Sequence, residues 1–333
     1  MQPALPAYLA VGATPSEQRL TRLDLARWVV DRGNPLTARV FVNRLWKQFF
    51  GAALSKNTDD LGSQGEWPVQ PELLDWLAVE FMESGWDVKH MVRTIVTSSA
   101  YRQVSTATPE LLAADPDNRL LARQSRFRLD AELVRDNALA VSGLLAPTIG
   151  GPSAKPYQPA GYWENLNFPV REYEADTNAN QYRRGLYTWW QRTFPHPSMI
   201  AFDAPSREEC AADRTRANIP QQALVLLNDP TYVEAARTLA TRIMASAATT
   251  TDARIAFAWQ LVLQRDPTGD ELTVARSVFE KHSAEYAANP TAAGEVLKVG
   301  LSPLPAETDQ PTLAAWTSVA RIVLNLHETI TRN

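Results

Sequence analysis

Apolar residues recur at helical spacing within the first hundred residues of the chain. After Asn34 and Pro35, apolar side chains stand at positions 36, 40, 41, 45 and 49, and Gly51 follows them. Asparagine is a preferred N-cap, proline suits the first helical position, and glycine ends helices readily. The pattern predicts an amphipathic helix that begins after Asn34 and ends at Gly51.

The same signals predict further helices downstream. Pro71 opens one helix and Gly85 closes it, and Asp87 can cap the helix that follows. Another helix is expected from about Leu129 to Leu145. The connections between the early helices are short, which favours antiparallel packing of neighbours.

The middle of the chain has a different pattern. From Ala146 to about Pro205 it is rich in Pro, Gly, Tyr and Trp, with the turn chemistry that interrupts helices. Residues 184–190 have the β-branched and aromatic content of a short strand, although a helical turn fits them almost as well. We expect an ordered but irregular aromatic region.

Helical patterns return in the last third. Asp229 and Pro230 predict the start of one helix, and apolar positions between Thr312 and Ile330 predict another. Ser206 and Thr268 are each followed three residues later by glutamate, which is the capping-box pattern.

The predicted fold class is mainly α, a multi-helix domain with an irregular aromatic, Pro- and Gly-rich middle segment and at most a small β-hairpin. Four parts are expected along the chain: residues 1–21 as an N-terminal junction or linker, 22–145 as an N-terminal helical part, 146–205 as the aromatic-rich loop region, and 206–333 as a C-terminal helical part. The alternative is one continuous domain from 22 to 333.

Composition and charge exclude several classes of protein. Hydrophobic residues make up 45% and charged residues 21% of the 333 residues, as in a globular chain. The net charge of -4 lacks the Lys and Arg excess of a nucleic-acid-binding protein. No stretch approaches the length of a membrane span, and the first residues do not form a secretory signal. As written the chain would be cytoplasmic, whereas as a piece of a longer protein it could be exported.

Cysteine and histidine usage points away from metal and haem sites within this chain. Cys210 is the single cysteine, so an intramolecular disulfide, a Cys-rich metal site and covalently attached haem are excluded. The four histidines share no metal-ligand spacing, and no GxSxG elbow marks a catalytic serine. We expect no metal and no cofactor in this chain, and the sequence leaves open whether the protein is an enzyme.

The densest polar segment begins at Asp203. The weak catalytic candidates there are Asp203, Glu208, Glu209 and Cys210, because carboxylates serve acid–base chemistry and a thiol can be a nucleophile. The alternative is structural, because caps, turns and ion pairs use the same residues and a lone cysteine is commonly a small buried hydrophobe.

Aromatic and arginine residues supply candidate ligand-binding groups. Flat rings and guanidinium groups suit sugar rings or acidic groups. The candidates are Tyr157, Tyr162, Trp163, Arg183, Arg184, Tyr187, Trp189, Arg207 and Arg216. The alternative is that the rings form the core of a region that has little regular structure.

A series of motifs carries a family resemblance. In order they are NPLTARVFVNRLW, LGSQGEWPVQPELLDWLAVEF, SGWDVKHMVRTIVTSSAYRQ, RFRLDAELVRD, GGPSAKPYQPAGYWE, YRRGLYTWWQRT, FDAPSREEC, RANIPQQALVLLNDP and LNLHETITRN. Together they closely resemble the bacterial family named domain of unknown function 1553, found mainly in planctomycetes and related bacteria. The resemblance covers almost everything from Arg22 to Asn333.

The resemblance implies a setting more than a reaction. Family members commonly form the C-terminal module of large exported proteins, behind a signal peptide, a related domain of unknown function and often a cytochrome c-type haem domain. A periplasmic or cell-surface location is therefore expected. Any haem would belong to a partner or to a module outside this chain, which has no CxxCH motif.

Three function hypotheses follow. The leading one is a non-catalytic binding or assembly module of an exported, cytochrome-associated system, linked to polysaccharide. The alternative is a carbohydrate-active enzyme, either a hydrolase or the substrate-side partner of a redox protein, with Asp203 and Glu208 or Glu209 as paired carboxylates. A purely structural protein would instead expose an apolar docking patch, expected near the stretch before Arg22. A pocket uniting carboxylates with tryptophans would favour the enzyme, and dispersed carboxylates beside an aromatic face would favour binding.

Overall fold

The computed structural model describes residues 3–6, 9, 19–159, 161–163, 172–191 and 194–332. Of the predicted junction, residues 1–2, 7–8 and 10–18 lie outside the described residues. The chain divides into two compact units, unit 1 with Met1–Phe127 and unit 2 with Arg128–Arg332. The four-part division expected from the sequence stays a prediction.

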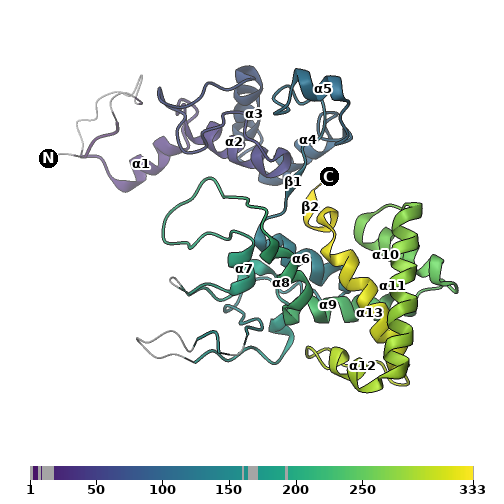
Figure 1. Ribbon diagram of the computed structural model, residues 1–333. Coiled ribbons are helices and arrows are strands. Elements are labelled where there is room, and N and C mark those ends of the chain that lie inside the picture. Colours follow the sequence, from purple (N-terminus) through teal and green to yellow (C-terminus); the bar gives the residue numbers. More distant parts are fainter. Residues whose placement is uncertain are drawn as a thin grey trace. The chain divides into compact units, whose positions relative to one another are not determined.

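Unit 1 is built around three helices. Its described helices are α1 (Arg22–Val29), α2 (Thr37–Phe50), α3 (Pro71–Glu83), α4 (Val88–Thr97) and α5 (Pro109–Ala114), shown in Figure 1. Helices α2, α3 and α4 pack together, and their apolar faces form one core that includes Val42, Phe50, Leu77, Phe81 and Met91. Burial of these side chains is the main stabilising term for the unit.

The predicted helix boundaries of unit 1 are confirmed to within two residues, since α2 begins at Thr37. The Asn34 side-chain oxygen accepts hydrogen bonds from the backbone N–H groups of Leu36 (3.0 Å) and Thr37 (3.1 Å) at the start of α2. Gly51 ends α2 with a left-handed φ of 74°. Asp87 caps α4 through the backbone N–H groups of its first turn. These signals are local, so the sequence was sufficient to place them.

Unit 2 contains the remaining helices of the described chain. They are α6 (Ala131–Ser142), α7 (Pro197–Ala201), α8 (Pro220–Asn228), α9 (Pro230–Met244), α10 (Thr251–Leu263), α11 (Gly269–Ala288), α12 (Pro290–Leu297) and α13 (Gln310–Asn325). Short 3-10 turns cover Ala179–Tyr182, Gly185–Tyr187 and His327–Ile330. The two short strands β1 (Phe127–Arg128) and β2 (Thr331–Arg332) pair with each other.

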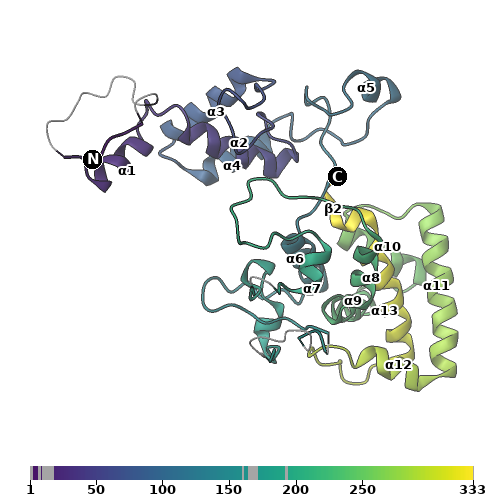
Figure 2. The ribbon, with the colours of Figure 1, turned by 60° about the vertical axis from the view of Figure 1, so that its left-hand side comes forward.

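Helix α13 is the centre of the unit 2 core. It packs against α9 on one side and α11 on the other, as both views of the ribbon show (Figures 1 and 2). Trp316, Val319 and Val323 on this helix are completely buried. A helix that is buried on most of its circumference is typical of the interior of a large helical core.

The mainly α fold class is confirmed, and three local expectations change. Residues 184–190 form a 3-10 turn at Gly185–Tyr187, so the helical alternative holds. The helix expected up to Ile330 ends at Asn325 and continues as a separate 3-10 turn. The expected capping box at Ser206 is wrong, because no helix begins there, whereas the one at Thr268 is confirmed.

The failure at Ser206 has a physical reason. Asp203 and Arg207 both have a left-handed backbone, with φ of 60° and 63°, which a right-handed helix excludes. The Ser206 hydroxyl accepts only a long bond of 3.4 Å from the Glu208 backbone N–H, within an exposed turn. The segment then runs without a helix as far as α8.

Two glycines of unit 1 allow a stability prediction. A Cβ added to Gly85 (φ 74°) would meet open space, whereas a Cβ added to Gly51 would lie 2.5 Å from the Phe127 ring. We expect Gly85→Ala to lower the free energy of unfolding by roughly 1–2 kcal/mol, the cost of a left-handed backbone for a residue with a Cβ. Gly51→Ala should lower it further, because the ring must also move. Urea unfolding followed by circular dichroism measures both, and equal losses would contradict the steric contribution.

Candidate functional site

Asp203 is held in an ion pair and is not a free acid. Its Oδ2 accepts hydrogen bonds from the Arg128 Nη2 (2.6 Å) and from the Ala217 backbone N–H (2.8 Å). Arg128 is itself buried, and it also donates to the carbonyl oxygens of Ala217 and Phe202. Asp203 therefore ties together the two ends of the 203–217 segment.

The other predicted catalytic residues lie on the surface of that segment. Glu208 and Glu209 are exposed, and Cys210 is an exposed free thiol. The structural interpretation of Cys210 as a buried hydrophobe is therefore wrong. All three side chains belong to a solvated turn.

Two predicted ligand-binding arginines form ion pairs with carboxylates at the start of α6. Arg207 approaches Glu132 at 3.7 Å and stacks over the Trp190 ring, with 4.1 Å from its guanidinium carbon to the ring centroid. Arg216 pairs with Asp130 at 3.4 Å. These contacts hold the 206–217 segment against α6. Both residues therefore have the structural role that was the alternative to ligand binding.

Arg183 and Tyr187 hold a neighbouring loop in place. The buried Arg183 guanidinium donates to the carbonyl oxygens of Pro152 (2.5 Å) and Gly150, and it stacks over the Tyr187 ring at 3.9 Å. The Tyr187 hydroxyl accepts a hydrogen bond from the Gly150 backbone N–H at 2.9 Å. Arg184 is exposed. Arg183 is therefore engaged within the fold through both of its Nη groups.

Tyr157 belongs to a buried polar cluster that sequence reasoning missed. Its hydroxyl donates to Glu234 Oε2 (3.0 Å) and accepts from the Leu301 backbone N–H (3.0 Å). Glu234 Oε1 accepts from the Tyr182 hydroxyl (2.7 Å) and the Ser302 backbone N–H (2.6 Å). Burial, together with the Glu234 charge, raises the pKa of Tyr157 to about 12, so its hydroxyl remains a donor at neutral pH. Nothing in the local sequence of α9 marks Glu234 as a buried carboxylate.

Three rings lie together in what we call the aromatic platform: Trp163, Tyr173 and Trp189. The two tryptophans were predicted as ligand-binding residues, and Tyr173 was not. The ring centroids lie 5.8 Å apart for Trp163 and Tyr173, 5.8 Å for Trp163 and Trp189, and 5.9 Å for Tyr173 and Trp189. Each ring is partly exposed. The Trp163 Nε1 donates to Gln158 (2.5 Å) and the Tyr173 hydroxyl to the Pro156 carbonyl (2.6 Å), so two of the rings are oriented by hydrogen bonds.

Tyr162 lies at the border of the aromatic platform. Its ring contacts Phe194 with centroids 4.4 Å apart, and Phe194 also contacts Trp163 at 4.9 Å. The Tyr162 hydroxyl donates to the Pro195 carbonyl at 3.2 Å. Tyr162 therefore supports the platform by packing.

Lys155 gives the aromatic platform a positive charge. Its ammonium lies 5.5 Å from the Trp189 ring centroid and 5.9 Å from that of Tyr173, which is within cation–π range. No carboxylate of the described residues lies within ion-pair distance of this ammonium. Sequence reasoning missed Lys155 and Tyr173, because only the folded loop brings them beside the tryptophans.

A buried serine and histidine pair lies deeper in unit 2. The His196 Nε2 contacts the Tyr157 carbonyl oxygen at 2.7 Å, and its Nδ1 contacts the Ser198 hydroxyl at 2.9 Å. Because a carbonyl can only accept, Nε2 carries the proton and Nδ1 accepts from the hydroxyl. Both side chains are buried, at 2% and 4% exposure, so no substrate can reach the hydroxyl. The pair is structural.

The described residues contain no group of three or more His, Cys, Asp or Glu side chains that could hold a metal ion. None of their helices is long and apolar enough to cross a membrane.

Comparison with known proteins identifies a family. The family model described as protein of unknown function (DUF1553) matches residues 21–279, well over half of the chain, and confirms the resemblance over those residues. The motif LNLHETITRN lies beyond the matched residues. No curated protein and no solved structure matches the chain.

The buried His196 generates a pH prediction. Burial first, and then the nearby Arg135 charge, lowers its pKa from 6.5 to about 4. Between pH 6.5 and 4 the unfolded chain therefore binds a proton that the folded chain does not. The contribution of the neutral His196 to the free energy of unfolding is complete above pH 6.5 and declines as the pH falls towards 4. We expect about 3 kcal/mol of unfolding free energy to be lost across this window.

The matched variant for this prediction is His196→Gln, which keeps a donor for the Tyr157 carbonyl. Burial raises the pKa values of Asp136 and Asp229, which acts in the opposite direction, but both carboxyls are present in the two proteins. The difference in urea-unfolding free energy between the two proteins, measured from pH 7.5 to 4.5, therefore isolates His196. A difference that does not change with pH would contradict the prediction.

Proposed function

The chain belongs to the DUF1553 family, and on that premise we propose that it is a non-catalytic binding module whose ligand is a saccharide. The binding site is the aromatic platform of unit 2. The exported, cytochrome-associated setting implied by the family resemblance is part of the proposal.

The observation that carries the proposal is the juxtaposition of Trp163, Tyr173 and Trp189 with the Lys155 ammonium. Partly exposed rings offer flat apolar faces, on which the C–H faces of a sugar ring can stack. The ammonium offers three hydrogen-bond donors to hydroxyl or carboxylate oxygens. A cation without a carboxylate partner among the described residues favours an acidic saccharide over a neutral one.

The dispersed carboxylates favour binding over hydrolysis. Glycoside hydrolysis uses two carboxyl groups about 5–10 Å apart on either side of the scissile bond. Asp203 is instead engaged by Arg128 and Ala217, and Glu208 and Glu209 lie on an exposed turn. An aromatic face with dispersed carboxylates is the arrangement expected of a binding protein. This arrangement supports a binding function over hydrolysis.

The assembly part of the proposal is supported by α1. This helix buries none of its residues, and Leu23, Leu25, Val29 and the following Val30 are exposed. Exposed apolar residues gathered on one short helix are typical of a surface that another module covers.

Removal of two rings tests the saccharide site. We expect the chain to bind a uronic-acid polymer and the double variant Trp163→Ala, Trp189→Ala to bind it at least tenfold more weakly, because stacking area is lost. Trp67→Ala is the matched control, since Trp67 is 78% exposed and belongs to unit 1. Isothermal titration calorimetry on variants with unchanged circular dichroism measures the affinities.

The Lys155→Met variant tests the ligand class in the same experiment. It should lose the preference for the uronic-acid polymer over a neutral glucan while it retains binding to the rings. Unchanged binding in the double tryptophan variant would refute the site, and no binding of the parent chain to either polymer would refute the saccharide.

Sedimentation velocity tests the assembly part. The related domain of unknown function that precedes this module in family members, produced separately, should co-sediment with the chain. Leu23→Ser together with Leu25→Ser should abolish the complex because the apolar contact area is lost. Leu301→Ser, at an exposed position of unit 2, is the control. Co-sedimentation that survives the double α1 variant would contradict a role for α1.

A further inference from the structure

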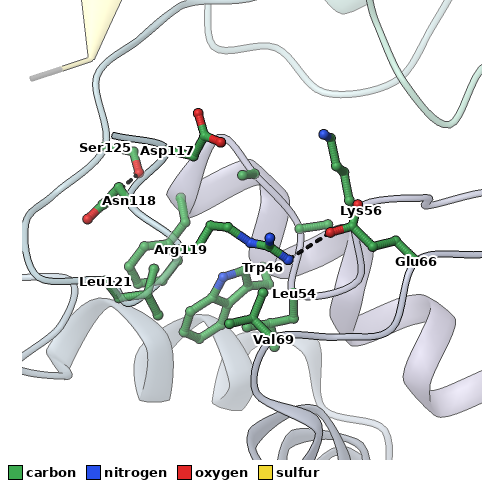
Figure 3. A pocket seen from close by; sticks show the side chains of 13 residues that line it. Trp46, Leu54, Lys56, Glu66, Val69, Asp117, Asn118, Arg119, Leu121 and Ser125 are labelled. Carbon is green, nitrogen blue, oxygen red and sulfur yellow. Dashed lines mark hydrogen bonds and ion pairs between the residues drawn. The ribbon is translucent and has the colours of Figure 1, made fainter. Parts of the chain in front are cut away.

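Unit 1 contains a pocket that the proposed saccharide site does not use. Its volume is about 310 Å³, and all its lining residues belong to unit 1. The end of α2 contributes Trp46 and Phe50, and the segments around Leu54 and Leu121 complete its apolar part (Figure 3). This volume is at the lower end of the range of ligand pockets, about 300–1,000 Å³, so it suits one small molecule or one ring-sized group.

The apolar part of the pocket is firmly built. Trp46 and Phe50 are stacked with ring centroids 4.1 Å apart, and both are nearly fully buried. Apolar walls of this kind exclude water and favour an apolar group. The apolar face expected from the sequence, at positions 36, 40, 41, 45 and 49, includes neither residue, and the structure buries Trp46 and Phe50 instead.

The opposite wall is a loop fixed by its own hydrogen bonds. Asn118 and Leu121 have left-handed backbones, with φ of 51° and 57°. The Asn118 amide donates to the Arg123 carbonyl at 2.8 Å, and Asp115 accepts from the Arg119 backbone N–H at 2.8 Å. A left-handed leucine costs free energy that the surrounding contacts must offset, and such strain is often found at binding sites. The wall is therefore held in place before a ligand arrives.

Four charged side chains line the pocket along with these apolar residues. Glu66 and Arg119 neutralise each other in an ion pair of 2.7 Å. Lys56 and Asp117 form no ion pair or hydrogen bond with any described residue. In Figure 3 the charged ends of Lys56 and Asp117 lie on the same side of the Glu66–Arg119 pair, and Trp46 lies on its other side.

This arrangement has a specific electrostatic consequence. One cation and one anion without partners among the described residues are complementary to a molecule that carries both an anionic and a cationic group. Both side chains are exposed, so water solvates them when no ligand is bound; a ligand with a single charge would pair with only one of them, whereas a zwitterion would pair with both. The apolar walls favour in addition an apolar group attached beside the two charged groups, next to Trp46 and Leu121.

We propose that the unit 1 pocket binds a small zwitterion with an apolar body, of which a free apolar α-amino acid is the simplest case. The side chain occupies the space beside Trp46 and Leu121, the carboxylate pairs with Lys56, and the ammonium pairs with Asp117. The site is independent of the aromatic platform, so either can fail without the other.

Calorimetry on the full chain tests the proposal with four probes. L-Phenylalanine should bind. N-Acetyl-L-phenylalanine, which lacks the cation, and L-phenylalaninamide, which lacks the anion, should each bind at least tenfold more weakly. Glycine, which has the two charges without the apolar body, should show no binding at the same concentrations.

Two variants assign the charges to their partners. Lys56→Met should weaken L-phenylalanine binding and remove its advantage over the amide, whereas Asp117→Asn should remove its advantage over the N-acetyl derivative. Lys89→Met, at an exposed position of α4 outside the pocket, should change nothing. Equal binding of all three phenylalanine compounds, or absence of L-phenylalanine binding at millimolar concentration, would overturn the proposal.

Discussion

Buried side chains that hydrogen-bond to irregular backbone are the interaction on which unit 2 depends. Between Ala146 and Pro205 few backbone groups of the described residues belong to a helix or sheet, yet buried groups of this kind must still be paired. Arg183 bonds the carbonyl oxygens of Gly150 and Pro152, and the Gln181 side chain donates to the Asp176 carbonyl at 2.6 Å. In this region side chains form the hydrogen bonds to backbone groups that other backbone groups form in helices and sheets.

The helices supply the charged groups for this purpose. Arg135 on α6 is fully buried and donates to Thr231 and to the Gln181 carbonyl, and burial lowers its pKa. Glu234 on α9 binds the Ser302 backbone N–H as well as two tyrosine hydroxyls. Removal of one partner would leave a buried charge without compensation, so it would disturb the whole region. We call these buried contacts of Arg135, Arg183 and Glu234 the polar framework. The aromatic platform has its position because the polar framework holds the loops that carry it.

The two candidate ligand sites differ in how they are built. The aromatic platform combines side chains from loops that the polar framework orders, and its rings are partly exposed. The unit 1 pocket lies at the end of helix α2, where Trp46 and Phe50 also belong to the hydrophobic core. An open face suits a polymer that extends beyond the site, whereas a small pocket suits a single molecule.

Local patterns allowed the sequence to predict much of the helical structure. The starts of α2, α4, α9 and α11 and the end of α2 follow from caps and stop signals a few residues long, and the motifs identified the family. The same kind of pattern failed at Ser206. There the arginines at 207 and 216 pair with carboxylates at the start of α6, which is far away in sequence, and these contacts stabilise a loop in place of a helix.

The roles of the candidate site residues were decided by tertiary structure. Sequence reasoning selected Asp203 and Tyr157 as functional groups, and the fold uses them to bind Arg128 and Glu234. It did not select Lys155, Tyr173 or the Lys56 and Asp117 pair, whose neighbours come from distant segments. Helix capping depends on residues within one turn of each other, so the sequence by itself determined it. The partner of a charge or a ring depends on which segments pack together, and only the tertiary structure determines that.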